Sequence, residues 1–239
     1  RKCPGYINAL YLQASFYGQK GDLPQAISQY EENIQLIYDT LGRYDEKLDS
    51  NYGNLFATLL DAWQIDEAYR LLDAINDYYI RINNYKGWLN ILYGGVVKLE
   101  EQQQIDKANE LCDKIIENIS ILSIEEQEII ASKKSQLCYK SNDIAGAVRW
   151  QERAVELADE LDRDTFLLAL SDLAALYRIG GDSSKSLECF LHLKLLLEQA
   201  DLEMYNIYGN TISEIVGFYE TNLSEAESIW RKSIAHIES

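Results

Sequence analysis

A ten-residue segment recurs six times along this chain, at intervals of about forty residues. The copies are GDLPQAISQY (21–30), WQIDEAYRLL (63–72), QQIDKANELC (103–112), NDIAGAVRWQ (142–151), GDSSKSLECF (181–190) and TNLSEAESIW (221–230). Each copy has a small residue in its sixth place: Ala26, Ala68, Ala108, Ala147, Ser186 and Ala226. This constant period predicts a solenoid, in which each repeat is one supersecondary unit that stacks on its neighbours.

Each repeat has the pattern of two helices joined by a short turn. In the fifth repeat, one helix face carries apolar residues at i, i+3, i+4 and i+7: Leu170, Leu173, Ala174 and Tyr177. Gly180, Gly181 and Asp182 interrupt this pattern, and Ser186 and Phe190 resume it on a second helix. Two antiparallel helices approach closely only where a side chain is nearly absent. We therefore expect the small residue of each repeat at the crossing of its helix pair.

The use of proline and aspartate agrees with paired helices. The chain has only two prolines, Pro4 and Pro24, which favours long uninterrupted helices over a loop-rich β-sandwich. An aspartate stands at or just before the expected second helix in five repeats: Asp22, Asp66, Asp106, Asp143 and Asp182. A short acceptor at this place satisfies the free amides of a helix N-terminus. The sequence therefore predicts the all-α class.

The charge of the chain restricts its partners. Lysine and arginine number 22 against 39 aspartates and glutamates, which gives a net charge of −17. This charge opposes the phosphate neutralisation that nucleic-acid binding requires, so nucleic acid is rejected as a ligand of this segment. Docking to an anionic membrane is also disfavoured, and basic or neutral partners are favoured.

The chain also lacks targeting signals. No window of about 18 apolar residues is present, and the N-terminus has no signal-peptide pattern, so a cytoplasmic protein is expected. Because the sequence begins at Arg1 without a methionine, we interpret it as a fragment of a longer protein.

The four cysteines show no C-x-x-C spacing. Cys112, Cys138 and Cys189 lie in apolar helical stretches, whereas Cys3 is near the chain end. We expect the first three to be buried free thiols in a reducing compartment.

Motifs for catalysis and metal binding are missing from the sequence. It has two histidines, His192 and His236, which cannot build a histidine-rich zinc site. It contains no G-x-S-x-G, P-loop, G-x-G-x-x-G or H-E-x-x-H motif. We therefore expect no catalytic residues, no cofactor and no metal.

The sequence resembles the tetratricopeptide repeat family, whose units place a small residue, an aromatic residue and a Gly-Asp turn at these offsets. The resemblance is clearest in GDLPQAISQYEENI and LSDLAALYRIGGDSSKSLECF and extends over the whole chain. It implies an α-solenoid of six antiparallel helix pairs in a right-handed superhelix. The repeat boundaries are then 7–46, 49–86, 88–126, 127–164, 166–205 and 207–239 within a single domain. The period near forty is similar to the long variant found in kinesin light chains and bacterial signalling proteins.

The resemblance also implies a binding groove, because the first helix of each unit lines the concave face in this family. The candidate ligand-binding residues are Tyr11, Asn54, Asn90, Tyr93, Lys133, Gln136, Tyr139, Arg178, Tyr208 and Phe218. Amides can bind a peptide backbone, tyrosines offer rigid contact area, and the two cations can hold an acidic side chain or a terminal carboxylate. In the alternative interpretation, Lys133 and Arg178 pair with local carboxylates such as Asp172.

Two functions follow as hypotheses. In the first, the chain is a non-enzymatic module that binds a protein or peptide segment in its concave groove. In the second, it is the regulatory or oligomerisation arm of a multidomain bacterial signalling protein, such as a transcription regulator, a nucleotide cyclase or a protease. A homo-oligomer is compatible with either hypothesis.

Overall fold

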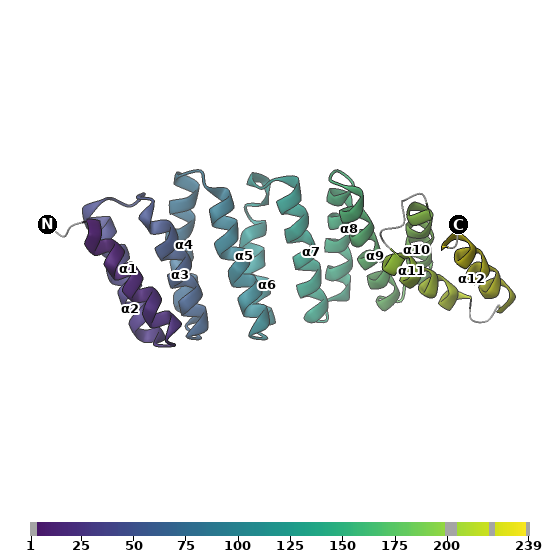
Figure 1. Cartoon of the computed structure of the whole chain (residues 1–239), viewed down its shortest axis with the longest axis horizontal. Coiled ribbons are helices and arrows are strands. Elements are labelled where there is room, and N and C mark those ends of the chain that lie inside the picture. Colours follow the sequence, from purple (N-terminus) through teal and green to yellow (C-terminus); the bar gives the residue numbers. More distant parts are fainter. Residues whose placement is uncertain (1–3, 199–204, 220–222, 238–239) are drawn as a thin grey trace. The chain divides into compact units, whose positions relative to one another are not determined.

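The computed structural model describes residues 4–198, 205–219 and 223–237 (Figure 1). These residues form twelve α-helices and one short 3-10 helix, and no strand occurs among them. The α-helices follow one another as antiparallel pairs, two helices to each sequence repeat. The all-α class and the six helix pairs expected from the sequence are therefore confirmed.

The chain divides into two compact units, residues 1–122 and residues 123–239. The helices of unit 1 are α1 (Pro4–Gln19), α2 (Leu23–Thr40), α3 (Lys47–Asp61), α4 (Ile65–Arg81), α5 (Tyr85–Glu101) and α6 (Ile105–Ile116), followed by the 3-10 helix Ile119–Ile121. Those of unit 2 are α7 (Ile124–Lys140), α8 (Ile144–Ala158), α9 (Arg163–Ile179), α10 (Ser183–Glu198), α11 (Tyr205–Phe218) and α12 (Leu223–Ile237). Each pair begins two or three residues before the repeat boundary expected from the sequence.

The turns inside the helix pairs share one backbone conformation. In five pairs, the residue that stands five places before the small residue has a φ between 59° and 84°: Gly21, Trp63, Gln103, Asn142 and Gly181. The N–H that follows it donates to the carbonyl five residues earlier, as Asp182 donates to Tyr177 at 2.9 Å. This is the hydrogen bond of a Schellman motif, which ends the first helix. Glycine adopts this left-handed conformation without strain, whereas tryptophan and glutamine do not.

The aspartates at these turns have two different roles. Asp22, Asp143 and Asp182 accept the backbone N–H three residues further on, at 2.9 to 3.4 Å. Asp66 and Asp106 lie instead in the first turns of α4 and α6, behind an N-cap glutamine that makes no side-chain cap. Their carboxylates can only interact favourably with the positive end of the helix dipole, so the expected side-chain cap is wrong for these two repeats.

Small residues sit where the helices approach closely. The small residue of the repeat is buried in all six pairs, with zero exposure in the first five. Gly95 has the same role on α5, because a Cβ atom there would lie 2.5 Å from the Phe56 ring and 2.9 Å from Leu111. Helix α5 therefore packs against α3 and α6 through bare backbone.

The thiols follow the expected pattern in part. Cys112 and Cys138 are buried and form no disulfide, as expected, but Cys189 is only half-buried. Its partial burial raises the pKa of the Cys189 thiol above the ordinary value. Cys3 lies outside the described residues.

Candidate functional site

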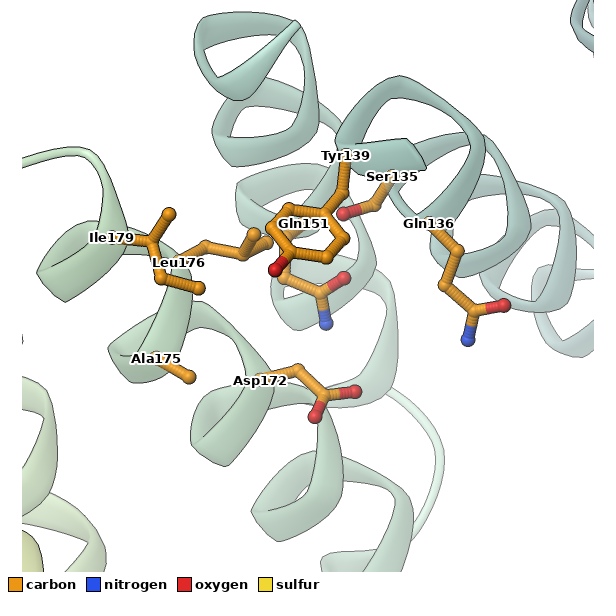
Figure 2. A pocket seen from close by; sticks show the side chains of 8 residues that line it. All are labelled: Ser135, Gln136, Tyr139, Gln151, Asp172, Ala175, Leu176 and Ile179. Carbon is orange, nitrogen blue, oxygen red and sulfur yellow. The ribbon is translucent and has the colours of Figure 1, made fainter. Parts of the chain in front are cut away.

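Unit 2 has a pocket of about 280 Å³ on the side formed by α7 and α9, which are the first helices of two consecutive pairs (Figure 2). The lining residues are Ser135, Gln136 and Tyr139 of α7, Gln151 of α8, and Asp172, Ala175, Leu176 and Ile179 of α9. Two of them, Gln136 and Tyr139, belong to the binding set expected from the sequence. The pocket thus lies between two consecutive helix pairs.

The floor of this pocket is held by buried hydrogen bonds. The Ser135 hydroxyl donates to the Ala147 carbonyl at 2.9 Å, which joins α7 to α8. The Gln151 amide donates to the Ala169 carbonyl at 3.1 Å, which joins α8 to α9. Both side chains are buried, so these bonds fix the relative positions of the three helices.

Sequence reasoning missed the importance of Gln151. In the alignment of the repeats it stands where the other five have a large side chain or cysteine, and its polarity was the available signal. The structure shows that this polar side chain replaces an apolar contact by a hydrogen bond to the next pair.

The rim of the unit 2 pocket combines an aromatic, an apolar and an acidic side chain. Tyr139 is 47% exposed and Ile179 is 52% exposed. Figure 2 shows the Tyr139 ring and the Asp172 carboxylate directed into the space between α7 and α9. Partial desolvation in this position raises the pKa of the Asp172 carboxyl above its ordinary value. The pocket therefore offers one carboxylate against a largely apolar wall.

The two cations expected to bind a ligand are engaged within unit 2. Lys133 donates to the Gln136 side-chain oxygen at 3.1 Å. Arg178 forms an ion pair with Glu214 of α11. Arg178 thus pairs with a local carboxylate, as in the alternative interpretation, but the carboxylate belongs to Glu214 and not to Asp172.

Unit 1 has a second pocket, of about 270 Å³, on the corresponding side of its helix pairs. Three residues expected to bind a ligand meet there, because Tyr11, Asn54 and Asn90 all line it. The Asn54 amide donates to the Tyr11 hydroxyl at 3.0 Å, which joins α3 to α1. Asp49 also lines this pocket, and its carboxylate accepts a hydrogen bond from the Tyr79 hydroxyl.

Comparison with known proteins identifies the fold. No protein-family model matches the sequence, and no curated protein matches it. Solved structures do match. A signal transduction ATPase with a tetratricopeptide repeat sensor from Pyrococcus horikoshii is 15% identical, with a TM-score of 0.57 over 98% of this chain and 36% of that one. A putative kinesin light chain with TPR-like repeats from Podosopora anserina is 16% identical, with a TM-score of 0.52 over 85% of this chain and 100% of that one.

A third match is BtubC from P. vanneervenii, which is 17% identical, with a TM-score of 0.50 over 80% of this chain and 79% of that one. The chain has a tetratricopeptide-like repeat fold. At these identities the likeness shows the TPR-like fold alone.

The remaining expected binding residues lie elsewhere in the TPR-like units. Tyr93 and Phe218 are half-buried and line neither pocket, and Phe218 packs against the core between α9, α10 and α11. Tyr208 is 2% exposed, and its hydroxyl donates to the Glu198 carboxylate at 3.0 Å. The expectation that Tyr208 faces a groove is therefore wrong.

A shift in register explains the burial of Tyr208. The sequence alignment placed the sixth repeat 40 residues after the fifth. In the structure, the buried residues Tyr208 and Ile215 lie 41 residues after their buried counterparts Leu167 and Ala174. One residue corresponds to a rotation of about 100° around a helix, and this rotation turns Tyr208 into the core.

The described part of the chain has neither a metal-binding cluster nor a membrane-spanning helix. Among those residues, no group of three histidines, cysteines or carboxylates is arranged to hold a metal ion. None of the described helices combines the length and the apolar character needed to cross a membrane.

Proposed function

We propose that this chain is a non-enzymatic module that binds a peptide or protein segment along the faces formed by the first helices of its TPR-like pairs. The observation that supports this proposal most directly is that both units have a pocket on that side, and that five of the ten residues expected to bind line these pockets.

The side chains in the pockets suit an extended peptide. In unit 1, Asn54 and Asn90 line the same pocket, and amides can both donate to and accept from a peptide backbone. In unit 2, Tyr139 offers a large and stiff contact surface that loses little conformational entropy on binding. A segment that contacts several such pockets would gain affinity from each of them.

The scaffold beneath the unit 2 pocket also favours binding. The hydrogen bonds of Ser135 and Gln151 are buried, so the floor does not need to reorganise when a ligand arrives. A pre-organised surface avoids part of the entropy cost of association.

A selection from a random peptide library tests this function. We expect the chain to enrich peptides that it then binds in solution, as measured by fluorescence anisotropy. The double substitution Tyr139→Ala and Asn90→Ala should weaken binding at least about tenfold, which is roughly 1.4 kcal/mol. Tyr44→Ala is the matched control, because Tyr44 is 42% exposed and lines neither pocket. The proposal fails if no peptide is enriched, or if the control weakens binding as much as the double variant.

The regulatory arm remains a second candidate, and one observation favours it. One match, which covers 98% of this chain, is to part of a signal transduction ATPase with a tetratricopeptide repeat sensor. Under this hypothesis, the binding of a peptide would control an effector domain elsewhere in the protein. The reading frame on either side of this segment would reveal such a domain, and light scattering would show whether the chain self-associates.

A further inference from the structure

We propose that the unit 2 pocket between α7 and α9 takes the cationic side chain of a lysine or arginine in the bound peptide. This inference rests on the proposed function and specifies its ligand chemistry. It also replaces the acidic side chain or carboxylate that Lys133 and Arg178 were expected to hold by a basic side chain.

The size of the pocket suits one side chain. Its volume of about 280 Å³ is below the range of about 300–1,000 Å³ that is typical of sites for a whole drug-sized molecule. Ala175, Leu176 and Ile179 form an apolar wall on α9. The methylene groups of lysine and arginine pack well on such a wall while their charged ends remain near polar groups.

The charge in the pocket is that of Asp172. Its carboxylate is directed into the pocket, as Figure 2 shows, and no hydrogen bond or ion pair reaches it from the described residues. A cation that enters the pocket would provide the missing donor, and a charge-assisted hydrogen bond is among the stronger polar contacts in proteins. The Tyr139 ring stands on the opposite wall, where it can interact with the same cation through its π-face.

Lys133 and Arg178 do not neutralise this carboxylate. Lys133, which is one turn from Gln136, donates to the Gln136 side-chain oxygen. Arg178, which follows Ala175 by one turn, pairs with Glu214. Both groups therefore have partners other than Asp172.

The charge of the whole chain acts in the same direction. A net charge of −17 attracts a basic segment over a distance and repels an acidic one. This field would speed the encounter with a basic peptide, and the Asp172 pocket would then select the position of its cationic side chain.

Methyl NMR of the full chain tests the proposal at the pocket itself. The reporter is the δ1-methyl signal of Ile179, assigned with the variant Ile179→Leu. The probes are the Nα-acetyl methylamides of lysine, arginine, norleucine and glutamate, because norleucine keeps the aliphatic chain of lysine without its charge. We expect the lysine and arginine probes to shift the Ile179 signal and to bind at least about tenfold more tightly than the norleucine probe, a difference of roughly 1.4 kcal/mol.

Two variants separate the local charge from the overall charge. Asp172→Asn should remove the preference for lysine over norleucine. Asp164→Asn changes the net charge equally on the same helix but outside the pocket, and it should keep the preference. The proposal is overturned if lysine and norleucine bind equally to the wild type, if the glutamate probe binds best, or if Asp172→Asn keeps the full preference.

The test also distinguishes this inference from the proposed function. If library peptides bind through Tyr139 and Asn90 but show no dependence on Asp172, the proposed function stands and the inference is wrong. If no library peptide is enriched while the lysine probe still shifts the Ile179 signal in an Asp172-dependent way, the pocket chemistry stands and the peptide-binding function is wrong.

Discussion

The hydroxyl of Ser186 on α10 donates to the backbone carbonyl of Ala174 on α9 at 2.8 Å. In the preceding pair, Ser135 on α7 donates to the carbonyl of Ala147 on α8 at 2.9 Å. Ser186 and Ala147 are equivalent positions of the repeat, and so are Ala174 and Ser135. Both pairs therefore place one serine and one alanine at their crossing. The serine donor lies on the second helix in the α9–α10 pair and on the first helix in the α7–α8 pair. A hydroxyl fits there because the facing carbonyl satisfies it.

This bond predicts the effect of Ser186→Ala. The variant loses a buried hydrogen bond but opens almost no space, so it should lower the free energy of unfolding by about 0.5–1.5 kcal/mol. Urea denaturation followed by circular dichroism measures the change. Ser184→Ala is the control, because Ser184 is exposed on the same helix. Equal stabilities of the two variants would show that the bond contributes nothing.

The crossing of α7 and α8 should not accept a larger side chain. Ala147 has zero exposure, so Ala147→Leu overpacks the pair and should cost about 1–3 kcal/mol of stability. Ala145→Leu on the same helix is exposed and should leave the free energy of unfolding almost unchanged. Thermal melting of both variants gives the comparison, and a wild-type melting temperature for Ala147→Leu would contradict close packing at this position.

The turn between α5 and α6 carries backbone strain that glycine should relieve. Gln103 has a φ of 60°, whereas the equivalent turn positions Gly21 and Gly181 use glycine. A left-handed conformation costs a non-glycine residue about 1–2 kcal/mol, part of which is offset by the greater unfolded-state entropy of glycine. Gln103→Gly should therefore raise the free energy of unfolding by about 0.5–1 kcal/mol. Ser28→Gly in the middle of α2 should instead lower it, and a loss of stability in Gln103→Gly would refute the argument.

The pocket carboxylate should reduce stability as the pH rises. Desolvation raises the pKa of Asp172 in the folded chain, so its contribution to stability is present below the pKa of the unfolded chain and is lost as the pH rises through the folded pKa. The stability of Asp172→Asn relative to wild type should therefore increase between about pH 3.5 and pH 7, since an ordinary aspartate titrates near 3.9.

Melting temperatures of wild type, Asp172→Asn and the control Asp164→Asn at the two pH values measure this difference. The control removes the same charge from α9 outside the pocket. A relative gain of the same size in both variants would assign the effect to net charge and not to the pocket.

The architecture could be predicted from the sequence because its signals are local and repeated. The small residue recurs six times, and the turn chemistry recurs with it. The resemblance to tetratricopeptide repeats made Tyr11, Asn54 and Asn90 candidates, and the three do line one pocket.

The aspartates show that an acidic residue near the start of a helix does not by itself predict an N-cap. Asp22 stands in the second place of its repeat segment and Asp66 in the fourth, and only Asp22 caps its helix. Both second helices begin at the third place of the segment, at Leu23 and Ile65, so Asp22 is the N-cap whereas Asp66 lies inside the first turn.

The sequence by itself determined the period, the helical class and the small residues at the crossings, because each depends on residues close together in the chain. The tertiary structure alone decided that Tyr208 is buried, that Arg178 pairs with Glu214, and that Asp172 is left without a donor among the described residues. The physical reason is rotation: one residue of register turns a side chain by about 100° around its helix. Whether that side chain meets core, counter-ion or open pocket then depends on helices that lie some forty residues away.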